Sequence, residues 1–96
     1  MSYHSERSDL GKAVLSLERA REGVRYRVAL IARAESLNDR TWQGAVLRLE
    51  ELGMFAGEML EKSGSLGPLA AIIVKVGGSR VAVSRDLARS VLLREV

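Results

Sequence analysis

The sequence predicts a mainly β protein with one or two short helices, in which about five short strands form a small barrel. Three observations support this fold class. Residues 24–30 alternate between apolar and polar or small side chains, residues 70–76 are rich in β-branched side chains, and a Gly-Gly pair stands at 77–78. Alternation is typical of a half-buried strand, and two glycines between strands are typical of a tight hairpin.

The composition predicts one domain. Of the 96 residues, 47% are hydrophobic and 28% are charged, which suits a single modest core. We expect the domain to cover residues 14–96, after a mobile leader at 1–13 that is polar and without periodicity. The leader lacks the apolar segment of a secretion signal, and the longest apolar run, 69–74, is too short to span a bilayer. Together with the absence of cysteine, these features favour a cytoplasmic protein.

The first part of the domain predicts a short helical turn and then a strand. Ser16 is the expected N-cap of a turn over residues 17–22, which Gly23 ends. In the strand at 24–30, one face is expected to be buried and the other, with Arg25 and Arg27, to face solvent. The residues expected on the buried face are Val24, Tyr26, Val28 and Leu30.

An amphipathic helix follows a polar connection at 33–40. Apolar residues recur at helical spacing from Trp42 to Leu52, so we expect a helix at roughly 41–53 that ends at Gly53. Asn38, Asp39 and Thr41 are all suitable N-cap residues. A tight turn that ends at Gly57 then leads into a strand at 58–63.

The C-terminal half predicts three more strands. A loop at 64–68 contains the only proline and precedes a strand at 70–76. The hairpin at 77–78 connects it to a strand at 80–83. Ser84 is the expected N-cap of a short turn at 85–89, and a final strand runs over 91–96.

From Leu17 to its C-terminus, the chain resembles the FeoA family of small cytoplasmic ferrous iron transport proteins. The residues that carry the resemblance are Arg48-Leu49-Glu50-Glu51-Leu52-Gly53-Met54 with Gly57, Leu66-Gly67-Pro68-Leu69, and Val74-Lys75-Val76-Gly77-Gly78-Ser79-Arg80-Val81-Ala82-Val83, followed by Ala88 and Val91. The resemblance implies an SH3-like barrel. Two departures stand out: Ala56 takes the place of a usual proline, and segment 35–45, with Trp42, is longer than in a typical member.

The resemblance also implies an accessory role. Proteins of this family act with FeoB, a membrane iron transporter that has a cytoplasmic G-domain. We therefore expect this chain to dock on the cytoplasmic part of a FeoB-type transporter and modulate iron uptake, with membrane association only through that partner. The candidate partner-binding residues are Met54, Phe55, Trp42 and Arg80. For the first three the alternative is a place in the core, and for Arg80 it is an ordinary solvated position.

The sequence offers no catalytic, cofactor or metal site. The single histidine, His4, stands in the expected leader and has no second histidine or cysteine to complete a metal site or a catalytic triad. The glycine pairs lack the ending of a phosphate-binding loop. Arg48, Arg80 and Arg85 are candidates for donating an arginine to a partner's GTP hydrolysis.

Two other functions are compatible with the sequence. One is a regulatory or nucleic-acid-associated module related to the SH3-like C-terminal domain of iron-dependent repressors. Nucleic acid is disfavoured, because the 15 basic and 12 acidic residues are interspersed, giving a net charge of only +3, and aromatic residues are few. The other is self-association into a homo-oligomer through exposed sheet edges.

Overall fold

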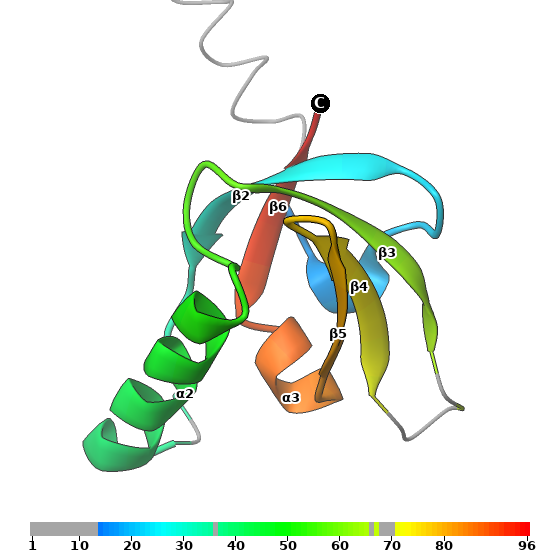
Figure 1. Cartoon of the computed structure of the whole chain (residues 1–96). Helices are drawn as coiled ribbons and strands as arrows, with labels where there is room; N and C mark the ends of the chain where they lie inside the picture. Colours follow the sequence, from blue (N-terminus) through cyan, green and yellow to red (C-terminus); the bar gives the residue numbers. More distant parts are fainter. Residues whose placement is uncertain (1–13, 36, 66, 68–70) are drawn as a thin grey trace, which may run out of the picture.

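The computed structural model describes residues 14–35, 37–65, 67 and 71–96, which form one antiparallel sheet with short helices beside it (Figure 1). The sheet has six strands in the order β1-β6-β2-β3-β4-β5. The strands are β1 (Leu15–Ser16), β2 (Arg25–Ile31), β3 (Met59–Ser65), β4 (Ile72–Val76), β5 (Ser79–Val83) and β6 (Val91–Glu95). The helices are the 3-10 helix η1 (Leu17–Arg19), α2 (Asp39–Glu51) and α3 (Arg85–Ala88). The leader expected at 1–13 lies outside the described residues.

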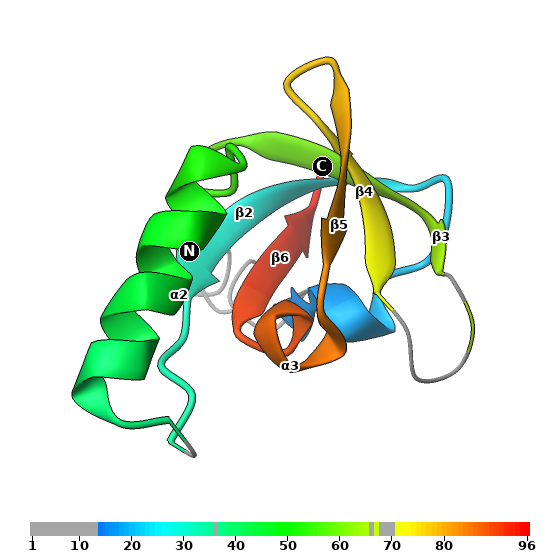
Figure 2. The ribbon, with the colours of Figure 1, turned by 60° about the horizontal axis from the view of Figure 1, so that its bottom comes forward.

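The sheet curls around its core without closing. β1 and β5 are its two edges and do not pair with each other, so the SH3-like barrel describes the fold only loosely. Figure 2 shows α3 between the ends of β5 and β6, on the open side of the sheet. The predicted mainly β class is confirmed, with a sixth strand because two residues of β1 pair with β6.

Strand β2 confirms the predicted alternation only as far as a bulge. Tyr26 and Val28 are buried, but the register with β6 shifts between Val28 and Leu30. A bulge inserts an extra residue and so reverses which side chains face the core. Leu30 is therefore 47% exposed, and its expected burial is wrong, while Ile31 packs against the core instead.

The N-terminal turn is shorter than expected. η1 ends at Arg19. Ser16 holds the predicted N-cap position with an extended backbone, but its side chain makes no capping hydrogen bond. Gly23 does not end this helix. Its φ of 79° and its N–H donation to the carbonyl of Lys62 (3.0 Å) turn the chain into β2.

The helix α2 lies two residues earlier than predicted, because Asn38 is its N-cap. The Asn38 side chain accepts a hydrogen bond from the Thr41 N–H at 2.9 Å, which decides among the three suitable residues. At the other end Leu52 is the C-cap, and Gly53 follows with a φ of 90°, as expected for a glycine after a helix. The described residues contain no helix of the length and apolar character that crossing a membrane requires.

The C-terminal half follows the prediction closely. Gly77 and Gly78 both have positive φ (57° and 82°), as a type I′ turn between β4 and β5 requires. The Ser84 side chain accepts from the Leu87 N–H at 3.2 Å and caps α3, as expected. The loop predicted at 64–68 begins later, since β3 continues to Ser65; much of it lies outside the described residues.

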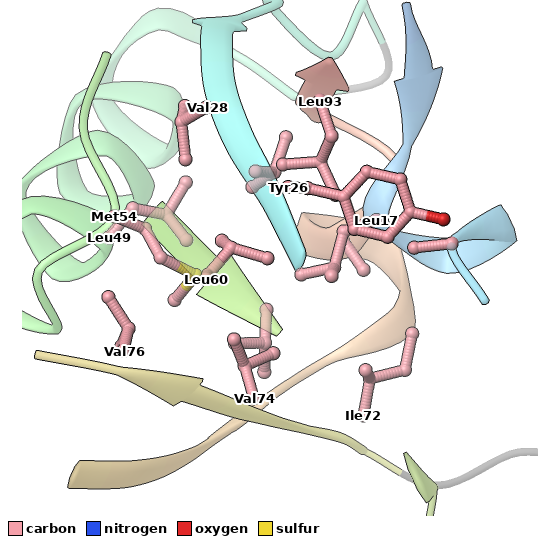
Figure 3. Close-up of a cluster of buried hydrophobic side chains, with 14 residues drawn as sticks. Leu17, Tyr26, Val28, Leu49, Met54, Leu60, Ile72, Val74, Val76 and Leu93 are labelled. Atoms are coloured by element: carbon pink, nitrogen blue, oxygen red, sulfur yellow. The ribbon is translucent and has the colours of Figure 1, made fainter. Parts of the chain in front are cut away.

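The core lies on the concave face of the sheet. Figure 3 shows side chains from β2, β3, β4 and β6 packed against Leu49 of α2, against Leu17 of η1, and against Met54, which follows α2. The buried phenol of Tyr26 accepts a hydrogen bond from the Arg21 N–H at 3.0 Å, which satisfies its oxygen. Apart from Leu49 and the C-cap Leu52, residues of α2 take no part in this core. The helix is therefore attached chiefly at its C-terminal end.

Candidate functional site

The connection between α2 and β3, residues 53–58, forms a rigid corner at the surface. The Met54 N–H donates to the carbonyl of Leu49 at 2.9 Å, which closes the helix end. The Glu58 N–H donates to the carbonyl of Phe55 at 3.0 Å across a β-turn, in which Gly57 has a φ of 94°. Since no other residue type in the described chain has positive φ, Ala56 does not, and the turn is of type II.

The corner is fastened to β2 by three hydrogen bonds. The Gly57 N–H donates to the carbonyl of Val28, and the Val28 N–H donates to the carbonyl of Glu58, both at 2.8 Å. An Nη1 proton of Arg27 is donated to the carbonyl of Gly57 at 2.7 Å. With these bonds in place, the turn is positioned by the sheet as well as by the helix.

Met54 and Phe55 have opposite environments on this corner. The Met54 side chain is fully buried, at 0% exposure, and points toward Leu49 and Leu60 (Figure 3). The Phe55 side chain is 45% exposed. Of the two residues expected to meet a partner, only Phe55 has an exposed side chain. The side chain of Met54 belongs to the core, so its expected place at a binding surface is wrong.

Arg80 lies on β5, close to the corner in the fold. Val76, at the end of β4, packs against Gly53: a Cβ built on that glycine would lie 3.5 Å from a methyl group of Val76. Val76 pairs with Ser79, the residue before Arg80. The structure therefore brings the hairpin that carries Arg80 and the corner that carries Phe55 together, and Arg80 is exposed.

Trp42 lies away from this pair, near the N-terminal end of α2. Ten residues separate it from Leu52, a rise of roughly 15 Å along the helix. Its half-buried side chain lines a shallow surface hollow together with Gln43, Val46 and Leu47. Leu47, 60% exposed, was not singled out by the sequence pattern; its position outside the i, i+3, i+4 series of the buried face is the signal that could have identified it.

The described residues provide no metal centre, since they contain no group of three or more histidine, cysteine, aspartate or glutamate side chains placed to hold an ion. His4 lies outside them. Of the three arginines considered as donors to GTP hydrolysis, Arg48 and Arg80 are exposed, whereas Arg85 is half-buried and donates from Nη2 to the carbonyl of Gly67 at 3.2 Å.

Comparisons with known proteins give one family and one fold. A family model described as the FeoA domain matches residues 15–95. A crystal structure of an iron uptake regulatory protein, FeoA, is 28% identical with a TM-score of 0.68, over 86% of this chain and 97% of that one. The FeoA protein of Chlorobium tepidum is 22% identical with a TM-score of 0.66, over 85% of this chain and 70% of that one.

The same fold occurs in metal-dependent repressors. A manganese-dependent transcriptional repressor aligns with a TM-score of 0.71 at 14% identity, over 86% of this chain but only 42% of the repressor. At this identity the likeness shows the fold alone. No curated protein sequence matches the chain.

Proposed function

Because the chain belongs to the FeoA domain family, we propose that it is an accessory protein of ferrous iron uptake, which docks on the cytoplasmic G-domain region of a FeoB-type membrane transporter and modulates it. The proposal places the protein in the cytoplasm and gives it no catalytic role of its own. FeoA domains form a family of small accessory or regulatory type, rather than a known family of enzymes. The observation that carries the docking site is the exposed Phe55 on its fastened corner.

Phe55 has the properties of an interface anchor. Large aromatic side chains in defined positions contribute much of the binding free energy at protein interfaces. The turn that carries Phe55 is held by the backbone hydrogen bond across it and by the three bonds to β2, so little backbone freedom remains to be lost on binding. Arg80, exposed on the neighbouring hairpin, would add a contact to an acidic group at the rim.

Trp42 is proposed as a separate, second contact. Its distance from the corner means that one partner surface would have to extend along α2 to reach both. An interface of standard size, about 800 Å² on each partner, is large enough to do so. Substituting Trp42 and Phe55 separately and together therefore tests whether they share one partner surface.

The proposal is tested by measuring binding of the full chain to the cytoplasmic domain of the cognate transporter, in its GDP-bound and GTP-analogue-bound states. Phe55→Ala should weaken binding by about 10-fold or more, since truncation of an interface anchor typically costs about 2 kcal/mol or more and about 1.4 kcal/mol is tenfold. Val14→Ala is the matched control, because Val14 is 42% exposed and lies outside the corner. Met54→Ala is unsuitable, since it would damage the core rather than the surface.

Two results would contradict the proposal. If the transporter domain binds in no nucleotide state, the accessory role itself is lost. If it binds but Phe55→Ala and Val14→Ala have the same affinity as the unchanged chain, the role stands and the assignment of the corner is lost. The alternative of a nucleic-acid-associated module is supported by the fold alone, so docking is the better-supported function.

A further inference from the structure

The convex face of the sheet, turned away from the core, collects basic residues from four strands. Arg25 on β2 pairs with Glu61 on β3, Glu61 pairs with Lys75 on β4, and Lys75 pairs with Arg80 on β5. Directly paired residues of antiparallel strands have their side chains on the same face. These four residues therefore form one row across the sheet, spanning roughly 14 Å at the usual strand spacing.

A second row lies beside the first. Arg27, two residues after Arg25 and so on the same face, pairs with Arg94 on β6 and with Met59 on β3. The two rows are about 7 Å apart, the rise of two strand residues. We name the five cations of the two rows the basic face: Arg25, Arg27, Lys75, Arg80 and Arg94.

The cations of the basic face are not neutralised within the described part of the chain. The ion pairs found there use other cations, those of Arg21, Arg33 and Arg89. The one carboxylate in the two rows is that of Glu61, which leaves four net positive charges. Like charges on neighbouring strands repel each other, and an anionic partner removes that repulsion.

Apolar side chains lie at one end of the basic face. Leu30 pairs with Leu92, which is two residues from Arg94 and therefore on the same face; Leu30 is 47% exposed as a result of the β2 bulge. Phe55 belongs to the turn whose Gly57 carbonyl accepts from Arg27. A cationic surface with exposed leucine and phenylalanine at its border has the chemistry that binds the interface of an anionic membrane.

Nucleic acid fits the basic face less well. Single strands are held by several aromatic side chains that stack on successive bases. Neither row contains an aromatic residue, and the border adds only Phe55. A duplex accepts leucine and phenylalanine mainly as wedges between base steps, which costs unstacking energy, whereas a bilayer interface accepts them without such a cost. The exposed apolar side chains at the border of the basic face therefore favour an anionic bilayer over nucleic acid.

We propose that the basic face binds the headgroup surface of an anionic lipid bilayer, with Leu30 and Phe55 entering the interfacial region. The inference is tested apart from docking on a transporter, since a bilayer without protein suffices for it, although Phe55 and Arg80 take part in both. It assigns a direct contact with the membrane to a chain whose expected membrane association was only through a partner.

The test is co-sedimentation of the full chain with vesicles of phosphatidylcholine alone and of phosphatidylcholine with phosphatidylglycerol, at low and high salt. Binding should require phosphatidylglycerol and should weaken in high salt, because screening reduces the attraction. Arg25→Gln combined with Lys75→Gln should lower the binding constant by roughly 30-fold, about fivefold for each charge removed. Arg40→Gln combined with Arg48→Gln removes the same charge from exposed positions on α2 and should leave binding close to that of the unchanged chain.

A second variant keeps the test decisive if the first folds poorly. Arg80→Gln combined with Arg94→Gln changes two other exposed members of the basic face and should give a loss of similar size. The proposal is overturned if the unchanged chain does not sediment with anionic vesicles, or if the α2 variant loses as much binding as the face variants. Tighter binding to a DNA duplex or to poly-glutamate than to the vesicles, abolished by the same face variants, would also overturn it.

Discussion

At the scale of single residues, Ala56 offers a simple gain in stability. It occupies the second position of a type II turn, where φ is close to the value that proline fixes, and its N–H donates no hydrogen bond within the described chain. Ala56→Pro should therefore raise the free energy of unfolding by about 0.4–1 kcal/mol, because the unfolded chain loses freedom that the folded turn does not use. Chemical denaturation measures the change.

Gly57→Ala is the opposing control for that substitution. With a φ of 94°, Gly57 has a backbone conformation that alanine adopts only with strain, so the variant should lose more than about 1 kcal/mol. A lower stability for Ala56→Pro than for the unchanged chain would show that the turn is not of type II.

Met54 and Phe55 should differ sharply in their effect on stability, although they are neighbours. Met54→Ala removes a fully buried side chain and should cost about 2–5 kcal/mol, whereas Phe55→Ala should change stability by less than about 0.5 kcal/mol. Urea denaturation of the two variants tests this, provided that both have the same m value, the slope of the unfolding free energy against urea concentration. Similar losses for both would mean that Phe55 contributes to the core, and the corner would no longer present an anchor.

The sequence could not distinguish these two residues. Helical periodicity ends at Gly53, so beyond it neither residue has a face that can be assigned by counting. Their environments are set by a tertiary contact, the return of Met54 to Leu49 through a backbone hydrogen bond of 2.9 Å. The sequence could predict where the helix-to-strand corner lies, but not which of its two large side chains is exposed.

At the scale of the elements, the N-terminal half of α2 should be the most easily opened helical segment. It has no residue in the core, and its first turn depends on the Asn38 cap and on the ion pair between Arg33 and Asp39. Asn38→Ala should lower the local opening free energy of amides 42–45 by about 1 kcal/mol. Native-state hydrogen exchange measures this directly.

Arg40→Ala is the control for the cap, since Arg40 is exposed in the same turn and caps nothing. Equal acceleration of exchange by both substitutions would assign the effect to the turn in general.

The cap itself could not be chosen from the sequence, because Asn38, Asp39 and Thr41 all have side chains that accept a backbone N–H. The β2 bulge was hidden for a similar reason: an extra residue in a strand leaves no mark in an alternating pattern until its partner strand is known.

At the scale of the whole molecule, the fold class was predictable and the degree of closure was not. Alternation in β2, β-branched residues in β4 and the Gly77-Gly78 turn each specify a local structure that the fold retains. Whether β1 and β5 meet depends on sheet twist and on strand lengths, which are properties of all six strands together. A two-residue strand such as β1 has no periodicity that a sequence pattern could reveal.

Self-association through an open edge remains a prediction. β5 is an edge of the sheet and carries the exposed cation of Arg80, a kind of side chain that discourages pairing between two such edges.

The one-ended attachment of α2 has a mechanical consequence. The helix has thirteen residues and is roughly 20 Å long. It is held in the core by Leu49 and Leu52, and Figure 1 shows its N-terminal end away from the sheet. As long as its N-terminal half stays folded, a helix held in the core at one end converts a small sideways force at its other end into torque at its base. A molecule that pushes on Trp42 would thus apply torque at the corner where Phe55 lies. Gly53 of that corner packs against Val76 of the β4–β5 hairpin, so the torque would also act on the hairpin.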